Sequence, residues 1–548
     1  MSRIASRLMR GFATVGLWTM ASRVLGFLRD MAIAAALGAG PVAEAFFVAF
    51  TLPNLFRRFF AEGAFNTAFV PMFARKLEGE GQADARAFAE NAFAWLSGVL
   101  IALTLVAMAA MPWLVLALAS GTAGDARFAL SVDLGRLVFV YILFISLAAL
   151  MSGVLNALGR FAAAAAAPVL LNVILLAALG LAASGAADGA ILIGVPPAGG
   201  SGAAIGPDDL ATGSLLAVGV VLAGIAQLAL VWVAAARAGL TLRLRLPRPS
   251  AEMKRLLIIA APAALAGGVM QVNLVVGRQV GSYFEGAVAW MWIADRVYQL
   301  PFGVIGVAIG VVLLPTLTRA LRAGDSAGAR DAMARSAEFA LILTLPATAA
   351  LIAMPGLVVE VLFQRGAFTT ADTASTALAL AIYAAGLPAF VLAKVLQPAF
   401  FAREDTRTPL RYATICMVVN GVVAVGGMAV IGWTAAPLGT TVAAVVNAGL
   451  LWLGARRLDG PVMDQRLARR LPRMVLASVA MGLAVWAAAS AAAALDTVGK
   501  TAALVAIVSL GGALYGLLCL AAGALTMAEV KTLLRRRQPP GIADGIGP

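Results

Sequence analysis

The sequence is poor in charged residues and contains no histidine. Of its 548 residues only 12% are Asp, Glu, Lys or Arg, while 62% are hydrophobic and the mean hydropathy is +0.94. A typical soluble domain has about 25% charged residues, so a water-soluble protein of this size is excluded. Without histidine the chain lacks the commonest metal ligand and the side chain that most often carries protons near neutral pH.

Cysteine is almost as scarce. Cys416 and Cys519 lie within apolar runs, where we expect small core residues and not a disulfide. The N-terminus is basic, but no small-residue cleavage site follows a short apolar core, so we expect the first apolar segment to be retained. The net charge of +14 comes from short basic clusters between apolar runs, which argues against nucleic acid as a partner.

Long apolar runs make up most of the chain. A transmembrane helix needs about 20 apolar residues, and runs of this length predict an all-α polytopic membrane protein with fourteen transmembrane helices. The segment 186–210, rich in Gly, Pro and Ala, is predicted to be a loop. The predicted spans are 11–38, 44–73, 88–118, 134–158, 163–185, 211–236, 256–282, 287–317, 337–354, 374–401, 409–431, 437–455, 474–494 and 501–526.

The Lys and Arg residues fall on alternate sides of these spans. Cytoplasmic loops are enriched in Lys and Arg. With the N-terminus placed inside, most of the 41 lie in inward-facing segments, six of them between 237 and 255. The predicted outward loops hold Arg127, Arg365 and Lys500. We therefore expect both termini to be cytoplasmic and the number of spans to be even.

The chain also repeats itself. The stretch 69–80 resembles 313–324, and the stretch 111–118 resembles 354–361. The offsets are 244 and 243 residues, so the register is nearly constant across the whole repeat. Because each copy contains six predicted spans, the two copies start on the same side of the membrane.

This repeat predicts two parallel six-helix lobes plus two C-terminal helices. The N-lobe is 1–236, the C-lobe is 237–457, and 458–548 holds the last two helices and a cytoplasmic tail. Lobe pairs of this kind usually carry a substrate site at their interface. We therefore favour a transporter that works by alternating access over a duplication that is retained only for packing.

Several charged residues lie inside the predicted spans, where each costs about 2.5–3.5 kcal/mol on insertion scales. Cations outnumber carboxylates, so internal pairing cannot neutralise the group. A surplus of arginine at membrane depth favours an anionic ligand, phosphate in particular. The cations are Arg23, Arg29, Arg57, Arg58, Arg296 and Lys394, and the carboxylates are Asp30, Glu44, Glu62 and Asp295.

A purely structural interpretation of some of these charges stays open. Asp30 and Asp295 could serve only as salt-bridge partners that hold helices together, Asp295 with its neighbour Arg296 in particular. Arg58 and Arg136 could reach the membrane interface, and we expect Arg278 to be interfacial as well.

Three stretches around these charges strongly resemble the MurJ (MviN) family. They are SRVLGFLRD at 22–30, GAGPVAEAFFVAFTLPNLFRRFFAEGAFNTAFVP at 38–71 and ADRVYQLPFGVIGVAIGVVLLP at 294–315. Members of this family are lipid II flippases of the multidrug/oligosaccharidyl-lipid/polysaccharide exporter superfamily. The resemblance covers essentially the whole chain. It implies fourteen helices, with two lobes around a central cationic cavity.

The resemblance also implies a substrate and a set of binding residues. The substrate would be lipid II, the undecaprenyl-diphosphate-linked peptidoglycan precursor, moved from the cytoplasmic to the periplasmic leaflet of the bacterial inner membrane. Gln299 departs from the family pattern, because some relatives carry Glu there, which puts an acid-dependent gating step in doubt. The residues matched to substrate binding are Arg23, Arg29, Arg57, Arg296, Glu44 and Lys394, with Asp30, Arg58, Glu62, Asp295 and Gln299 in support.

The implied partners are lipid II and membrane lipids, with other cell-wall synthesis proteins as further candidates. We expect no metal or other cofactor. Transport would be driven by the membrane potential or by a coupling cation such as sodium. Asn273, Asn420 and Asn447 could bind that cation, although a polar residue in a span more often forms a helix–helix hydrogen bond.

Other membrane functions differ in the residues that they require. A flippase for another polyprenyl-diphosphate-linked sugar remains an alternative, because arginines would contact only the diphosphate. A cation-coupled multidrug exporter of the same superfamily is disfavoured, because its cationic substrates need a surplus of carboxylates. A membrane enzyme such as a lipid-linked glycosyltransferase, or an ATP-driven pump, is disfavoured by short outward loops and the lack of a Walker motif.

The predicted topology can be tested by thiol labelling. A cysteine introduced by Arg245→Cys should react with a membrane-impermeant reagent only from the cytoplasmic side, because it lies in the most basic predicted inward loop. Arg365→Cys, in a predicted outward loop, should react only from the periplasmic side. Labelling of position 245 in intact cells would mean that a span has been miscounted.

Overall fold

The computed structural model describes residues 3–57, 64–185, 205–243, 245–269, 272–459 and 463–529. Within these ranges every regular element is a helix, and nine helical segments are long and apolar enough to cross a membrane. This confirms the all-α polytopic fold, while the count of fourteen spans stays a prediction.

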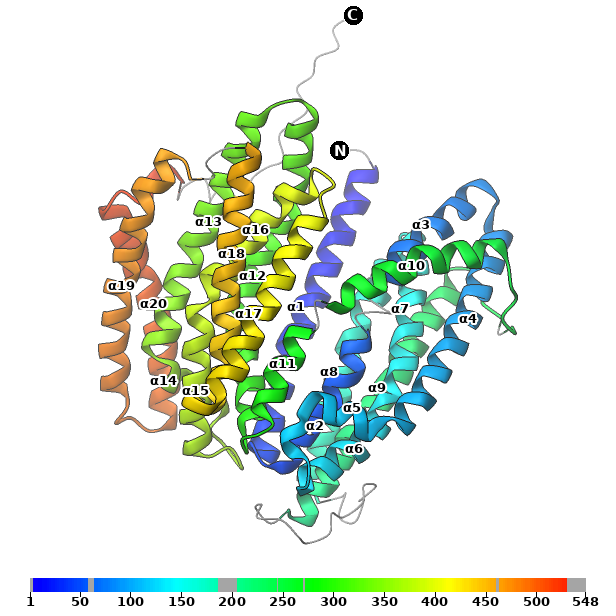
Figure 1. Cartoon of the computed structure of the whole chain (residues 1–548), viewed down its shortest axis with the longest axis horizontal. Helices are drawn as coiled ribbons and strands as arrows, with labels where there is room; N and C mark the ends of the chain where they lie inside the picture. The colour runs from blue at the N-terminus through cyan, green and yellow to red at the C-terminus, as the bar shows by residue number, and fades with distance from the viewer. Residues whose placement is uncertain are drawn as a thin grey trace, which may run out of the picture. The chain divides into compact units, whose positions relative to one another are not determined.

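The chain divides into two compact units, and Figure 1 labels the helices of both. Unit 1 combines the predicted N-lobe with segments of the predicted C-lobe, and unit 2 holds the remainder. Unit 1 comprises Met1–Arg296, Leu362–Ala379 and Met417–Val442. Unit 2 comprises Val297–Val361, Leu380–Cys416 and Ala443–Pro548.

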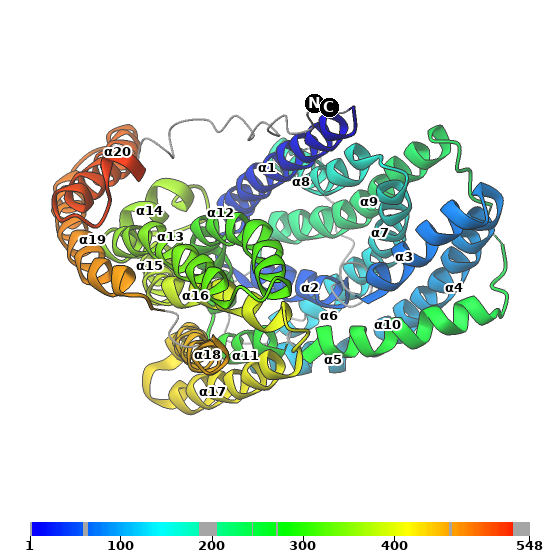
Figure 2. The ribbon, with the colours of Figure 1, turned by 90° about the horizontal axis from the view of Figure 1, so that it is seen from above.

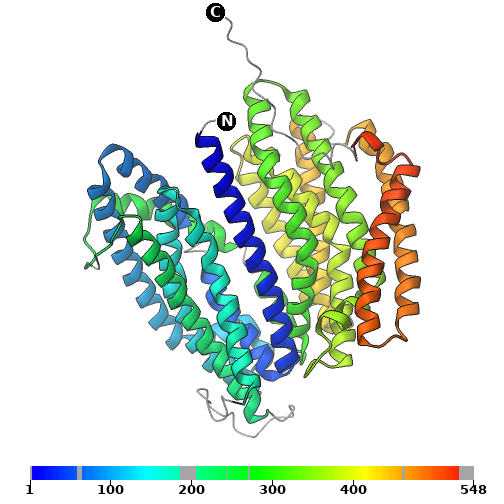
Figure 3. The ribbon, with the colours of Figure 1, turned by 180° about the vertical axis from the view of Figure 1, so that it is seen from behind.

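Unit 1 is a bundle in which α8 packs along both α1 and α9, as Figures 2 and 3 show. Further pairs are α2 with α6, α7 with α9, and α10 with α3. Its helices up to residue 296 are α1 (Arg3–Leu37), α2 (Pro41–Arg57), α3 (Ala64–Gly79), α4 (Gln82–Ala109), α5 (Met111–Ala119), the 3-10 turn η2 (Ser120–Thr122), α6 (Ala126–Phe139), α7 (Tyr141–Ala157), α8 (Phe161–Ala183), α9 (Pro207–Arg237), α10 (Ala251–Val269) and α11 (Val272–Gly281), with the start of α12 (Ala287–Arg322). The segments 362–379 and 417–442 add parts of later helices to this unit.

Several predicted spans consist of two helices. Span 88–118 divides into α4 and α5 at Met111, where Pro112 occupies the first turn of α5 and cannot donate a backbone hydrogen bond. Span 256–282 divides into α10 and α11. The predicted loop 186–210 lies outside the described residues as far as 204, but α9 already begins at Pro207.

Small residues allow these helices to approach closely. A Cβ atom on Gly224 would lie 2.8 Å from the Tyr141 ring, and one on Gly219 would lie 3.0 Å from Leu175. Helix association in lipid depends on van der Waals packing and hydrogen bonds, because lipid tails are as apolar as the side chains. The Ala- and Gly-rich α8 and α9 therefore suit close packing.

The C-terminal end of α1 is held by a turn from the second half of the chain. Ala367 N donates a hydrogen bond of 2.8 Å to Ala35 O. Gly38 and Gly366 both have φ of +59°, and a Cβ on Gly366 would lie 2.1 Å from Ala35 O. Glycine is required at this contact both for its backbone conformation and for space.

The linker between α9 and α10 is fixed along α4. Buried Glu90 accepts hydrogen bonds from the backbone N–H of Arg243 at 2.9 Å and from Arg86 Nε at 3.0 Å, and forms an ion pair with Arg245 at 2.9 Å. Asn91 exchanges two hydrogen bonds with the backbone of Arg248. This basic linker is therefore part of the packed surface of unit 1.

In unit 2, ion pairs join α13 to the C-terminal helix α19, which lies beside α20 in Figure 3. Buried Glu338 of α13 lies 2.5 Å from Arg470 Nη1 and also pairs with Arg335 and Arg466. The helices that contribute to unit 2 are α12, α13 (Ser326–Ala353), α14 (Pro355–Phe363), α15 (Thr370–Ala385), α16 (Leu387–Phe401), α17 (Arg407–Ile431), α18 (Ala435–Asp459), α19 (Gln465–Ala492) and α20 (Thr497–Ala521).

Glu529, just beyond α20, extends the same ion-pair network. Burial raises its pKa, but hydrogen bonds from Arg470 and Thr526 outweigh that effect and lower the pKa to about 2. The carboxylate therefore stays ionised at neutral pH and remains able to bind Arg470.

Gly366→Ala should destabilise the protein, because the new methyl group would meet Ala35 O and force a left-handed backbone on alanine. Strain of this kind costs about 1–3 kcal/mol, which a melting curve of the purified protein would resolve. Gly356→Ala is the matched control, because its Cβ would meet nothing within 4 Å. An unchanged melting temperature for Gly366→Ala would contradict the contact.

Candidate functional site

One carboxylate joins two arginines that are far apart in the chain. Asp30 Oδ1 of α1 lies 2.7 Å from Arg29 Nη2, and Asp30 Oδ2 lies 3.1 Å from Arg296 Nε of α12. Arg29 and Asp30 are buried, whereas about a third of the Arg296 side chain is exposed. The Arg296 contact is an ion pair without hydrogen-bond alignment. We call Arg29, Asp30 and Arg296 the Asp30 cluster.

A third helix of the bundle orients Arg29. Asn172 Oδ1 of α8 accepts a hydrogen bond of 2.8 Å from Arg29 Nη1, and Asn172 Nδ2 donates one of 2.9 Å to Ser22 O of α1. Asn172 is buried. Gly26 faces this amide, since a Cβ there would lie in van der Waals contact with it at 3.5 Å. The sequence analysis missed Asn172, whose only signal was a polar residue within an Ala- and Leu-rich span.

Aromatic rings support both guanidinium groups. Arg29 lies 5.9 Å from the centre of the Phe50 ring, and Arg296 lies 4.7 Å from that of Trp292. Trp292 in turn stacks on Phe47 of α2 at 4.9 Å. Cation–π contact is available to a delocalised guanidinium without using its N–H donors. The Arg29 donors bind Asp30 and Asn172 while its guanidinium also lies near the Phe50 ring.

The other predicted cations occupy different surroundings. Arg23 of α1 is exposed, and half-buried Arg57 of α2 donates a hydrogen bond of 3.3 Å to Asn54 Oδ1. Lys394 is exposed on α16 and belongs to unit 2, as does the half-buried Gln299. Arg58 and Glu62 lie outside the described residues.

Glu44 binds Arg127, a cation that was predicted to lie in an outward loop. Glu44 Oε2 lies 2.9 Å from Arg127 Nη1, and Glu44 Oε1 accepts a hydrogen bond of 3.0 Å from Val288 N. Glu44 and Arg127 are both buried, and Asp125 also pairs with Arg127 at 2.6 Å. Glu44 therefore joins α2, α6 and α12 at a point separate from the Asp30 cluster.

Arg278 is also buried, so its side chain is packed within the protein. Its side chain donates a hydrogen bond of 3.1 Å from Nη1 to Val288 O and lies over the Trp292 ring. The sequence could not show this, because Arg278 lies near the end of an apolar run, where arginines commonly extend to the interface.

The η2 turn and the end of α11 form a further contact, which we call the outer contact because the predicted topology puts 119–133 on the outward side. Ser120 N donates to Gln279 Oε1 at 3.1 Å, and Gly121 N donates to Ser282 Oγ at 2.9 Å. A Cβ on Gly121 would lie 2.4 Å from Tyr283 N. This contact and the Asp30 cluster both join the first half of the sequence to 272–296.

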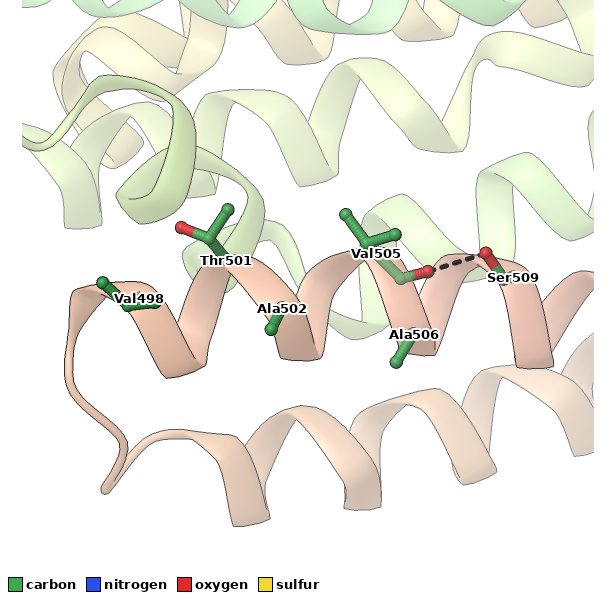
Figure 4. A pocket seen from close by; sticks show the side chains of 6 residues that line it. All are labelled: Val498, Thr501, Ala502, Val505, Ala506 and Ser509. Atoms are coloured by element: carbon green, nitrogen blue, oxygen red, sulfur yellow. Dashed lines mark hydrogen bonds between the residues drawn. The ribbon is translucent and has the colours of Figure 1, made fainter.

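A groove of about 600 Å³ on α20 has a different character (Figure 4). Its lining carries no charged side chain, so it does not suit an anionic group. The lining residues are Val498, Thr501, Ala502, Val505, Ala506 and Ser509. Among the residues that the structure describes, no cluster of three acidic or Cys side chains could hold a metal ion.

The family model for the lipid II flippase MurJ matches residues 33–506. The chain belongs to the MurJ family. A probable lipid II flippase MurJ of Rhizobium tropici is 41% identical over 545 residues, covering 98% of each chain. A lipid II flippase MurJ of Burkholderia cenocepacia is 35% identical over 452 residues, covering 82% of this chain and 84% of the relative.

Solved structures show the same fold at lower identity. A MurJ lipid II flippase in an inward closed conformation has a TM-score of 0.73 at 20% identity, covering 92% of this chain and 97% of that one. An inward-facing multidrug transporter of the MATE family has a TM-score of 0.64 at 14% identity, covering 80% and 94%. Membership of the MurJ family identifies the protein as a transporter and not an enzyme, in a multi-pass bacterial membrane fold.

Asp30→Asn should reduce transport as strongly as Arg296→Ala, because either change breaks the described ion pair of Arg296. Asp30 is buried and would leave Arg29 without its carboxylate, so Asp30→Asn should also melt at lower temperature. Asp295→Asn is the control and should retain more transport than either. Transport would be measured at matched membrane expression, and full activity of Asp30→Asn would contradict a role for the bridge.

Proposed function

We propose that this protein flips lipid II from the cytoplasmic to the periplasmic leaflet of the bacterial inner membrane by alternating access. Family membership over nearly the whole chain supports this substrate, because the matching relatives carry the name lipid II flippase. The observation that carries the mechanism is the Asp30 cluster, in which one carboxylate is shared by two arginines.

The substrate diphosphate would compete with Asp30. A phosphate group matches the planar fork of a guanidinium and carries more negative charge than a carboxylate. Arg29 and Arg296 both lie within ion-pair distance of the Asp30 carboxylate. A diphosphate that enters from the cytoplasmic side would exchange for Asp30, and Arg23 and Arg57 would add further positive charge.

Replacement of Asp30 by the diphosphate would couple substrate binding to opening of the transporter. The Asp30 ion pair ties α1 to α12, so its loss removes one of the contacts that join the first half of the chain to 272–296. The outer contact and the Glu44 hydrogen bond to Val288 would then separate more readily. The head group would leave into the periplasm while the lipid tail stays in the bilayer.

The orientation follows from the charge pattern. We place both termini and the linker between α9 and α10 in the cytoplasm, because Lys and Arg concentrate in cytoplasmic loops. The outer contact then lies toward the periplasm. The driving force is either the membrane potential or a coupling cation such as sodium, and other cell-wall synthesis proteins are candidate partners.

The surplus of cations over carboxylates also favours lipid II transport over the export of cationic drugs. Fold similarity to MATE transporters is compatible with both functions. The Asp30 cluster contains two guanidinium groups and one carboxylate, which attracts an anion and repels a cationic drug.

Single Arg→Ala variants at 23, 29, 57 and 296 test the proposal. Each lost charge-assisted hydrogen bond is worth about 1.5–3 kcal/mol, so lipid II binding should weaken roughly ten- to a hundredfold. Arg296→Lys should recover only part of the binding, because lysine lacks the planar fork. Binding to purified protein and rescue of a depleted strain would be measured at equal expression.

Arg160→Ala is the matched control, because Arg160 is exposed in a turn and should leave binding unchanged. If all four arginine variants bind lipid II and rescue growth like the wild type, the arginines serve only structure and the mechanism is wrong.

A further inference from the structure

The internal repeat of the sequence is also visible in the helix boundaries. Helices α4 and α13 have the same length, and each residue of α4 matches the residue 244 positions later in α13. The same offset relates α5 to α14, the start of α6 to the start of α15, and the end of α1 to the end of α11. The turn between α5 and α6 is therefore the counterpart of the turn between α14 and α15.

These two turns make the same kind of contact, each with a helix of the other copy. The turn between α5 and α6 holds the end of α11 in the outer contact. The turn between α14 and α15 holds the end of α1, where Ala367 N donates a hydrogen bond of 2.8 Å to Ala35 O and where Gly38 faces Ala367 and Gly366 faces Ala35. We call this the α1 contact. Because α11 ends at the counterpart of the end of α1, each contact is the repeat-related copy of the other.

Glycine permits a close approach of backbone in both copies. A Cβ on Gly121 would lie 2.4 Å from Tyr283 N, and a Cβ on Gly366 would lie 2.1 Å from Ala35 O. The atoms met are backbone atoms, so a change of side-chain rotamer could not relieve the overlap. A larger residue at either glycine should therefore push that contact apart.

A third contact marks the axis that relates the two copies. Glu44 Oε1 accepts a hydrogen bond of 3.0 Å from Val288 N, and these two residues are themselves 244 positions apart. Equivalent positions of two related copies can meet only where the axis between the copies passes. In parallel repeats this axis runs along the membrane normal. The outer contact and the α1 contact therefore flank the axis on opposite sides.

The two flanking contacts are made without charged groups. In the outer contact the Ser282 hydroxyl accepts from Gly121 N, and in the α1 contact the hydrogen bond joins two backbone groups. The rings of Phe27 and Phe363 add an edge-to-face contact beside the α1 contact, with their centres 5.6 Å apart. A diphosphate at the Asp30 cluster would not compete for these bonds, so they separate only when the two copies move apart.

We propose that the outer contact and the α1 contact are the matched halves of one outward gate, which opens only when both halves separate. This inference rests on the orientation given in the proposed function. While either half holds, it keeps the two copies together beside the axis, and the Glu44–Val288 hydrogen bond at the axis stays closed. The exit for the head group would form at the axis once both halves have parted.

A cysteine at the axis tests this without any substrate. Val288 is 1% exposed, and Val288→Cys keeps the backbone N–H that binds Glu44. The full-length protein in lipid vesicles is treated from outside with a membrane-impermeant maleimide. Gly121→Ala or Gly366→Ala alone should raise the labelling rate less than about threefold, and the double variant at least about tenfold, because the halves are coupled.

The control is Gly356→Ala, whose Cβ would meet nothing within 4 Å and which should leave the labelling rate unchanged. Native Cys519 is fully buried, so its labelling would report unfolding instead of opening. If either single variant labels as fast as the double variant, or if the double variant labels like the unchanged gate, the paired gate is wrong. None of these outcomes depends on lipid II, so they are separate from the fate of the proposed function.

Reversible links test the same gate from the closed side. Ser120→Cys with Gln279→Cys spans the outer contact, and Ala35→Cys with Ala367→Cys spans the α1 contact. Linking either pair with a short bifunctional methanethiosulfonate should slow lipid II flipping at least about tenfold, because one closed half suffices to keep the gate shut. A reductant should restore flipping in both cases.

The matched control is Asn91→Cys with Arg248→Cys, which links the α9–α10 linker to α4 and should leave flipping unchanged. Undiminished flipping with either half of the gate fully linked would overturn the paired gate. Failure of the unlinked protein to bind lipid II would instead count against the proposed function.

Discussion

The structure depends on how it neutralises charge at membrane depth, and Asp30 is the central case. Two guanidinium groups from α1 and α12 share its carboxylate, and each also has an aromatic ring beneath it. Buried pairs of this kind add little net stability, because desolvation offsets their attraction. Their presence is better explained by exchange: an ion pair with a residual positive charge holds two segments together and yields to a stronger anion.

Other buried charges of unit 1 also have partners, but the kind of partner differs. Glu44 and Asp125 together surround Arg127 and leave it no role as a free cation. Arg278 donates a hydrogen bond to a backbone carbonyl and lies over an indole ring. Pairing with a carboxylate does not by itself separate arginines that stabilise the fold from those that suit a substrate, because Arg29 also pairs with Asp30.

The sequence predicted the helical class and the residues of the Asp30 cluster, because apolar runs and charges at membrane depth are visible in the primary structure. The partner of Arg296 was harder, since the adjacent Asp295 is the obvious candidate in sequence while Asp30 lies far away in the chain. Arg127 was assigned to a loop because loop assignment counts residues outside apolar runs, whereas its burial results from the tertiary contact with Glu44. Trp292 had no sequence signal, because an aromatic residue in a span usually packs or meets lipid.

The linker along α4 has a mechanical consequence. The repeat in the sequence places the boundary between the lobes at 236/237, yet Glu90 and Asn91 hold the following residues against α4, and Lys76 pairs with Glu252 at the start of α10 at 2.6 Å. These contacts therefore hold the chain in place between the last helix of one copy and the first helix of the next. Any rotation of one lobe against the other must be absorbed farther along the backbone, so lengthening this linker would leave the amplitude of the motion unchanged.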